Sequence, residues 1–236
     1  MATPAATHRP RRRRVQADQA SLAGLAGLDR RAILEAALRL VDARGLEALS
    51  MRKLGAQLGV QAMTLYYYVP SKAALVQGLA EIVLEQLELP SAPVGDWPAA
   101  VRDVARSFRL LGLRHPNAFP LLATVGFDNP ASYRPTEVIL DVLGSAGFGA
   151  ELAFTAFTTI KSYVVGHVLW ILGDRLLGRG EPGPPPSLPA DAFPRLASYV
   201  PYLAVCEPEA EFERGLDVLV AGLEALRAQS NLSRRS

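Results

Sequence analysis

The sequence contains very few residues of the kinds that hold metals or form disulfides. It has one cysteine and three histidines in 236 residues. A single cysteine, Cys206, cannot form an internal disulfide, and no group of cysteine and histidine residues has the spacing of a zinc site. We therefore expect no bound metal and no cofactor, and a chain that folds around a hydrophobic core.

Long apolar runs are also missing. The longest apolar stretch, Tyr163–Gly173, is interrupted by His167 and is followed at once by two charged residues. A membrane-spanning helix needs about 20 apolar residues. Residues 17–28, which follow a group of arginines, contain a charged residue and two glycines instead of the apolar core of a signal peptide. The sequence therefore predicts a cytoplasmic protein that does not enter a membrane.

The motifs of common enzymes are absent as well. The sequence has no nucleophile motif and no glycine-rich loop of the kind that holds a phosphate. Its carboxylates are scattered, without a pairing that is visible in the sequence. We therefore do not expect catalysis.

The net charge is only +2, but the basic residues are concentrated near the N-terminus. The first 60 residues contain eleven arginines and lysines against five acidic residues. A local basic surface of this kind is typical of nucleic-acid binding. Residues 1–27 lack sustained periodicity and predict a flexible basic arm. The arm is either a solvated tail or a segment that contacts DNA phosphates or the minor groove.

From residue 28 onward, hydrophobic residues recur at helical spacing, and no segment alternates like a strand. Asp29, Ser50 and Ser71 are suitable N-caps, and Pro70 ends the helix before it. These signals predict four N-terminal helices, at about residues 29–45, 51–58, 61–69 and 72–89. Prolines and a glycine then mark a domain boundary near residues 90–98.

The remaining chain predicts further helices, at about residues 97–114, 117–125, 130–146, 150–177, 191–205 and 209–228. Residues 178–189, GRGEPGPPPSLP, are too rich in proline and glycine for a helix and predict a loop. The expected fold is therefore all-α. It comprises the arm at 1–27, a three-helix helix-turn-helix DNA-binding domain with the start of a linking helix at 28–89, and a larger helical domain at 90–230.

The segment Ser50–Leu79 carries the strongest functional signal. A helix-turn-helix needs a small residue where its two helices cross, a glycine in the turn four residues later, and apolar anchors on both sides. Gly55 and Gly59 meet the first two requirements. The anchors are Leu54, Leu58, Val60 and Leu65. The outer face of the third helix then presents Gln61, Ala62, Met63, Thr64, Tyr66 and Tyr67. Such side chains can read adenine, touch a thymine methyl group or bond phosphate oxygens.

This run closely resembles the tetracycline-repressor family of bacterial transcriptional regulators. The resemblance is carried by Gly45–Leu75, GLEALSMRKLGAQLGVQAMTLYYYVPSKAAL, and covers roughly residues 29–80. A weaker similarity to the C-terminal domain of the tetracycline repressors rests on the proline-punctuated helices, on Ala146–Phe148 before a long helix, and on Phe212–Leu226.

The resemblance implies a homodimeric repressor that binds palindromic operator DNA through its helix-turn-helix and is released when a small-molecule effector binds the C-terminal domain. The sequence leaves two alternatives open. The protein could activate transcription instead of repressing it, because the sign of regulation depends on where the operator lies. It could also need no ligand and act through a protein partner.

Taken residue by residue, the resemblance implies that Arg52 reads a base from the start of the second helix. It places Gln61, Ala62 and Met63 at base edges, and it implies that Ser50, Thr64, Tyr66 and Lys72 hold phosphates. Tyr68 is expected to pack where helices meet. With Tyr67 on the outer face, the expected DNA-contacting residues are Ser50, Arg52, Gln61, Ala62, Met63, Thr64, Tyr66, Tyr67 and Lys72.

Two helices are candidates for a dimer interface. Residues 150–177 are apolar on almost every side, so they need burial on every side. The last helix, at about 209–228, carries an apolar stripe in which Gly215 and Gly222 permit close approach. As in the family, these helices could form a four-helix bundle across a two-fold axis, with two recognition helices about one turn of DNA apart. Ordinary core helices in a monomer are the alternative.

Aromatic residues with polar neighbours in the C-terminal domain are candidates for a ligand pocket, although such residues also form ordinary cores. The expected ligand-binding residues are Phe108, His115, Phe119, Phe127, Phe157, Thr158, Lys161 and Trp170, with Phe154 as a further aromatic candidate. Tetracycline-sensing members use a histidine near an Arg-Pro pair to help hold a magnesium-tetracycline chelate. Here Arg134 and Pro135 follow Asn129–Tyr133, which contains no histidine. We therefore expect a mostly apolar organic effector that binds without metal.

Overall fold

The computed structural model describes residues 28–90, 96–124, 126, 129–176, 189–205 and 207–233. The basic arm, Phe127, Cys206 and all but the last residue of the proline-rich loop lie outside the described residues. Every regular element of the described chain is helical, and it contains no strand, so the predicted fold class is confirmed. The chain divides into two compact units, Met1–Val83 and Leu84–Ser236.

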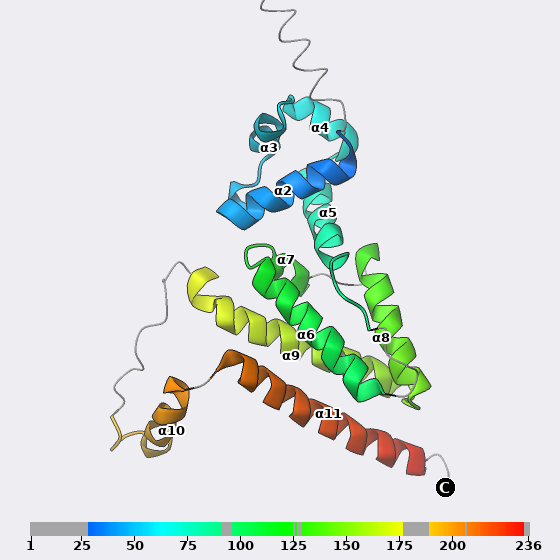
Figure 1. Ribbon diagram of the computed structural model, residues 1–236, viewed down its shortest axis with the longest axis vertical. Helices are drawn as coiled ribbons and strands as arrows, with labels where there is room; N and C mark the ends of the chain where they lie inside the picture. The colour runs from blue at the N-terminus through cyan, green and yellow to red at the C-terminus, as the bar shows by residue number, and fades with distance from the viewer. Residues whose placement is uncertain are drawn as a thin grey trace, which may run out of the picture. The chain divides into compact units, whose positions relative to one another are not determined.

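The first unit is built from short helices that begin at the N-caps expected from the sequence. It contains α2 (Arg30–Arg44), the 3-10 turn η1 (Leu46–Ala48), α3 (Met51–Leu58), α4 (Ala62–Tyr68) and nearly all of α5 (Lys72–Leu84) (Figure 1). A side-chain oxygen of Asp29 accepts a hydrogen bond from the backbone N–H of Ala32 at 2.7 Å. Ser71 Oγ accepts one from the N–H of Ala74 at 3.0 Å. Each cap satisfies a donor that the first turn of a helix leaves without a partner.

A small hydrophobic core joins α2 to the other helices of this unit. Leu34 of α2 is buried, as are Leu54 of α3, Leu65 of α4 and Leu75 of α5. Full burial of a leucine side chain contributes roughly 1.5–3 kcal/mol. Gly78 lets α5 approach α2 closely, because a Cβ at this position would overlap the side chain of Leu34.

Helix α5 ends earlier than the sequence predicted, at Leu84 instead of about residue 89. After Leu84 the backbone makes a turn in which the N–H of Leu87 donates to the carbonyl of Leu84 at 3.0 Å. The next N–H, of Glu88, donates to Ser107 Oγ at 2.8 Å instead of to its own helix. A tertiary hydrogen bond thus replaces the helical one, and the chain turns away within the second unit.

The second unit is a bundle around one long helix. It contains α6 (Trp97–Arg114), α7 (Phe119–Thr124), the 3-10 turn η2 (Pro130–Ser132), α8 (Tyr133–Ser145), α9 (Ala150–Leu176), α10 (Pro194–Ala204) and α11 (Pro208–Ser233). Helix α9 contacts α6, α8 and α11, and Figure 1 shows α6, α9 and α11 lying side by side. Phe119, Leu122, Leu143 and Phe212 are buried where these helices meet.

The central helix is unusually apolar. Residues Ala150–Gly173 of α9 are long and apolar enough to cross a membrane when judged by length and composition alone, a property that core helices of soluble proteins share. Here α9 packs against three neighbouring helices, and 33% of its most apolar window is buried within this chain. The structure therefore uses it as the centre of the second unit.

Candidate DNA interface and ligand pocket

The turn between α3 and α4 is held by its backbone. Ser50 Oγ accepts a hydrogen bond from the N–H of Lys53 at 3.3 Å and begins α3. Gly59 ends α3 in the left-handed conformation, with φ of 69°, which glycine adopts without the penalty that a Cβ brings. The N–H of Val60 then donates to the carbonyl of Gly55 at 2.9 Å. These bonds set the angle at which α4 leaves α3.

The close crossing of the two helices requires the glycine at position 55. A Cβ added to Gly55 would lie 2.8 Å from the carbonyl oxygen of Val60 and 3.2 Å from the backbone nitrogen of Ala62. Both neighbours are backbone atoms of the turn, so they cannot rotate away as a side chain could. The structure therefore has the small residue at the helix crossing that the sequence predicted.

The outer face of α4 presents large side chains to solvent. Met63 is 75% exposed and Tyr67 is 87% exposed, whereas Leu65 on the opposite face is fully buried. Large apolar side chains exposed together on a short helix mark a binding surface more often than a merely solvated one. This face is the candidate for base contacts.

All nine expected DNA-contacting residues are accessible to some degree. Six are exposed: Arg52, Gln61, Met63, Tyr66, Tyr67 and Lys72. Three are partly exposed: Ser50, Ala62 and Thr64. Tyr68 is also partly buried and meets the Tyr67 ring edge-on at 5.2 Å. Their places on α3, α4 and the start of α5 are compatible with contact to DNA, and the contacts themselves remain predictions.

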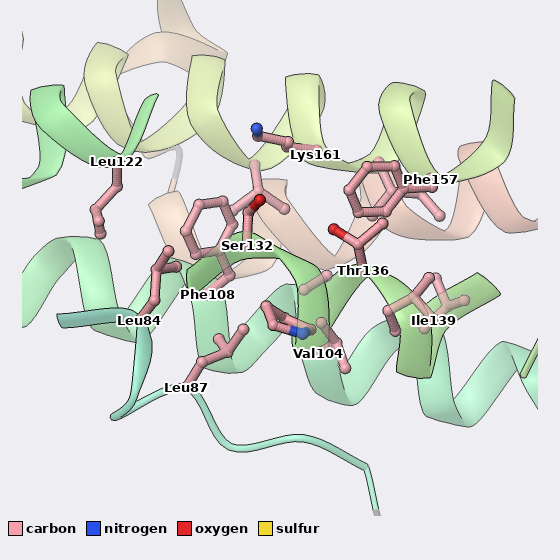
Figure 2. A pocket seen from close by; sticks show the side chains of 15 residues that line it. Leu84, Leu87, Val104, Phe108, Leu122, Ser132, Thr136, Ile139, Phe157 and Lys161 are labelled. Carbon is pink, nitrogen blue, oxygen red and sulfur yellow. The ribbon is translucent and has the colours of Figure 1, made fainter. Parts of the chain in front are cut away.

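A separate cavity of about 90 Å³ lies within the second unit. Its walls are mostly aliphatic and aromatic, and Figure 2 shows the side chains that line it. They are Leu84, Leu87, Val101, Val104, Ala105, Phe108, Leu122, Ser132, Pro135, Thr136, Ile139, Phe157, Ile160, Lys161 and Val164. The polar groups among them are the hydroxyls of Ser132 and Thr136 and the ammonium group of Lys161.

The cavity brings together some of the expected ligand-binding residues and leaves others out. Phe108, Phe157 and Lys161 line it. Phe119 is fully buried behind the wall, with its ring 5.6 Å from that of Phe108. His115 is buried elsewhere, where its Nε2 lies 3.1 Å from Oε1 of Gln86. Phe119 and His115 thus belong to the core around the cavity.

Two more of the expected residues lie away from the cavity on α9, and a third is not described. The Thr158 hydroxyl donates to the backbone carbonyls of Phe154 and Thr155 in its own helix, at 3.1 and 3.0 Å. Trp170 is 70% exposed. Phe127 lies outside the described residues.

The sequence argument missed the aliphatic and hydroxyl-bearing part of the wall, including Leu84, Leu87, Ser132 and Thr136. Their positions at helix ends and in a 3-10 turn carry no signal that separates pocket lining from ordinary core. The absence of a histidine between Asn129 and Tyr133 was visible in the sequence. Among the described residues, no group of three or more His, Cys, Asp or Glu side chains is placed to hold a metal ion.

Burial perturbs the ammonium group of Lys161. Desolvation lowers the pKa of Lys161 below its ordinary value of 10.5, because an apolar surrounding disfavours the charged form. The lysine stem belongs to the wall formed by α9, and Figure 2 shows its nitrogen on the α9 side of the cavity. The hydroxyls of Ser132 and Thr136 come from η2 and α8 on the facing side.

A second buried polar cluster lies where α6, α9 and α11 meet. His167 is 7% exposed, its ring lies 4.9 Å from that of Phe212, and its Nε2 has no hydrogen-bond partner among the described residues. Arg109 places its guanidinium carbon 5.2 Å from the centre of the Phe212 ring and binds Glu209 at 2.6 Å. Burial, and secondly the charge of Arg109, lower the pKa of His167 below 6.5, so its neutral form is favoured.

Comparisons with known proteins match both units. Residues 33–79 match the bacterial regulatory proteins of the tetR family, and residues 89–227 match the tetracyclin repressor-like C-terminal domain. The class C tetracycline repressor protein of Escherichia coli is 31% identical over 207 residues, which cover 86% of this chain and 94% of that protein.

Solved structures agree with these matches. The crystal structure of apo ActR from Streptomyces coelicolor has a TM-score of 0.73 at 29% identity, over 86% of this chain and 98% of that one. ActR in complex with actinorhodin has a TM-score of 0.74 at 29% identity, over 85% and 98% of the two chains. With two family domains matched in order and a helix-turn-helix of the required geometry, this chain belongs to the TetR family of DNA-binding transcriptional regulators, which are not enzymes.

Proposed function

We propose that this protein is a homodimeric cytoplasmic repressor that binds a palindromic operator through α3 and α4 and leaves it when a small apolar effector enters the cavity. The proposal rests mainly on the course of α5. Lys72 at its start belongs to the proposed DNA-contacting set, and Leu84 at its end lines the cavity. One continuous helix therefore connects the proposed sites along the chain.

The DNA part of the proposal assigns separate tasks to the exposed residues. Arg52, Gln61, Ala62 and Met63 face base edges in the major groove, where an arginine can bond the O6 and N7 atoms of guanine. Ser50, Thr64, Tyr66 and Lys72 bind phosphates, which positions the helices without reading sequence. Tyr67, the most exposed of the three tyrosines, extends the same face.

The effector part rests on the character and the size of the cavity. Its wall favours an apolar molecule, since most of the lining side chains are hydrocarbon. Its volume of about 90 Å³ is well below the roughly 300–1,000 Å³ of pockets that hold drug-sized ligands. An effector of that size would therefore extend out of the cavity or displace wall residues, among which are Leu84 and Leu87 at the end of α5. The similar protein ActR has been crystallised with actinorhodin, which supports an organic effector here.

The dimer part rests on apolar side chains that one chain leaves uncovered on α9 and α11. Phe154 is 46% exposed, Trp170 is 70% exposed and Val218 is 73% exposed. Burial of such residues against a second subunit would stabilise the assembly. A two-fold dimer also provides two recognition helices for a palindrome.

The experiment that tests this proposal is a pair of calorimetric titrations. An operator is first selected from random DNA by binding, and actinorhodin is titrated into the free protein and into the protein–operator complex. Binding equilibria at coupled sites are reciprocal, so the operator should weaken effector binding by the same factor by which effector weakens operator binding, typically ~5- to 150-fold.

Light scattering during both titrations follows the mass of the protein. A constant dimer mass is expected, because the effector changes the placement of the recognition helices and not the association of subunits. Equal affinity in the two titrations contradicts effector-controlled release. Loss of the dimer on effector binding replaces this mechanism with dissociation.

A further inference from the structure

The wall of the cavity contains one buried hydroxyl group that is open to a ligand. Thr136, in the first turn of α8, lines the cavity and is only 7% exposed. Its side-chain oxygen makes no hydrogen bond to another part of the chain that the structure describes. Figure 2 shows this oxygen pointing toward the space between Ser132 and Phe157, which also line the cavity.

The other polar side chains of the wall are already engaged. Ser132 Oγ donates toward the backbone carbonyls of Asn129 and Gly126, at 2.8 and 3.0 Å, so its hydroxyl hydrogen is committed. Lys161 likewise has an interaction within the chain. The remaining side chains of the lining are hydrocarbon. A ligand in the cavity therefore finds an open hydrogen-bond donor at Thr136.

We propose that the Thr136 hydroxyl donates a hydrogen bond to a carbonyl oxygen of the effector, so that the cavity accepts an apolar ketone and discriminates against the hydrocarbon of the same shape. This inference rests on the proposed effector function and names the chemical class that the cavity accepts. Thr136 has the role of a specificity-determining residue.

The apolar surroundings make this hydrogen bond decisive. A ligand that fills the cavity takes water away from the hydroxyl group, and burial of a hydroxyl without a new partner is unfavourable. A hydrocarbon ligand leaves Thr136 in that state. A carbonyl oxygen accepts the hydroxyl hydrogen where the local dielectric constant is low, so the bond is stronger than in water. A site with such a buried partner rejects analogues that lack the matching group.

A carbonyl oxygen matches this wall better than a ligand hydroxyl does. The threonine hydroxyl has one donor hydrogen and two acceptor positions. A ligand carbonyl takes the hydrogen and brings no donor of its own. A ligand hydroxyl adds a second buried donor to a wall that is mostly hydrocarbon. The carbonyl therefore satisfies the donor of Thr136 without creating another.

The helical position of Thr136 supports the direction of this bond. Thr136 and Ile139 lie about one turn apart on α8, and both line the cavity. The same helix face thus supplies the hydroxyl group and an apolar contact for the body of the ligand. A threonine side chain in a helix has few rotamers, so it loses little conformational freedom when the ligand binds.

The test uses 1-indanone and indane, which share a fused two-ring body and differ in one carbonyl group. Calorimetric titration gives the ratio of their affinities for the full-length wild-type protein and for Thr136→Val, which removes the hydroxyl. The substitution should weaken indanone binding and strengthen indane binding, so the ratio should fall roughly ten- to a hundredfold. Thr136→Ala, which also removes the hydroxyl, should lower the ratio too. Thr136→Ser, which retains it, should keep most of the wild-type ratio.

The matched control is Thr155→Val, the same substitution at an exposed threonine of α9 outside this cavity. The Thr155 hydroxyl donates to the carbonyl of Glu151 in its own helix at 2.9 Å. Both compounds should bind this variant as they bind the wild type. Val104→Trp, which fills the cavity from its wall, should abolish binding of both compounds. Melting temperatures of all variants verify that they are folded.

The possible outcomes separate this inference from the proposed function. An affinity ratio that is the same for the wild type and for Thr136→Val would overturn the role of Thr136 and leave the effector cavity intact. Binding of both compounds that Val104→Trp does not remove would place them outside the cavity and contradict the inference as well. Binding of neither compound, with no release of the selected operator by either, would refute the effector cavity together with this inference.

Discussion

Gly112, at the crossing of α6 and α9, offers a direct test of how the wall of the cavity is supported. A Cβ at this position would lie 2.6 and 2.7 Å from two ring carbons of Phe119 and 2.7 Å from a methyl carbon of Val168. Ordinary contacts of a Cβ atom lie at 3.4–4 Å. Phe119 and Val168 are both fully buried, so neither has free space into which it can move. Gly112→Ala therefore overpacks the crossing.

The expected cost follows from two opposing effects. Overpacking a well-packed core typically costs about 1–3 kcal/mol. Replacing glycine by alanine within a helix raises the free energy of unfolding by up to about 1 kcal/mol, because alanine has the higher helix propensity. Gly144→Ala is the matched control, because Gly144 is exposed near the end of α8 and its Cβ would have no neighbour within 4 Å. The steric cost is then the difference in the free energy of unfolding between the two variants, on the order of 1–3 kcal/mol.

Calorimetric unfolding of both variants measures this difference. For a chain of this length each kcal/mol shifts Tm by roughly 2–4 °C, so Gly112→Ala should melt about 2–12 °C below Gly144→Ala. Because the Phe119 ring packs 5.6 Å from that of Phe108, the displaced ring should also press Phe108 into the cavity and weaken effector binding. Equal melting temperatures for the two variants would refute the reasoning, since the crossing would then have room for a methyl group.

Three further predictions concern DNA binding and pH. Arg52→Ala should reduce the free energy of binding to the selected operator by about 1–3 kcal/mol and relax the preference at one base pair in each half-site, whereas Lys72→Ala should weaken binding to cognate and random DNA about equally. Footprinting that shows unchanged affinity and unchanged base preference for Arg52→Ala would contradict the role of Arg52. Deletion of residues 1–20 should leave the melting temperature unchanged. If the arm binds phosphates, the deletion should also make the slope of log operator affinity against log salt concentration shallower by roughly one to a few units. An identical slope for the full-length and truncated proteins would indicate a solvated tail. The lowered pKa of buried His167 means that the unfolded chain binds a proton more readily than the folded one, so stability is complete above pH 6.5 and falls as the pH drops from 6.5 toward the lowered folded-state pKa. His167→Phe should reduce that fall in urea unfolding at pH 7.5 and 5.0, and an unchanged pH dependence would assign the effect to another group.

Local sequence signals were sufficient to predict the helices and the turn of the DNA-binding unit. Ser50 caps α3 through a hydrogen bond within one turn, and Gly59 supplies the left-handed residue that ends it. Leu54 and Leu65 are buried at the spacing that a helix face requires. Each of these features depends on residues that are near in the chain, where the geometry of a helix or a turn limits the possible contacts. The periodicity of the apolar residues likewise determined that the fold is all-α.

Which residues line the cavity could be learned only from the tertiary structure. Helical periodicity states which side of α6 faces inward, but it does not state which inward residues meet a partner and which border empty space. Phe119 and Phe108 are both inward aromatic residues of neighbouring elements, yet Phe119 is fully packed and Phe108 lines the cavity. Leu84 and Leu87 line the cavity where α5 ends, and the next N–H, of Glu88, bonds there to Ser107, nineteen positions along the chain. A cavity exists where several helices together fail to fill a volume, and the shape of that volume depends on how residues distant in the sequence pack against one another.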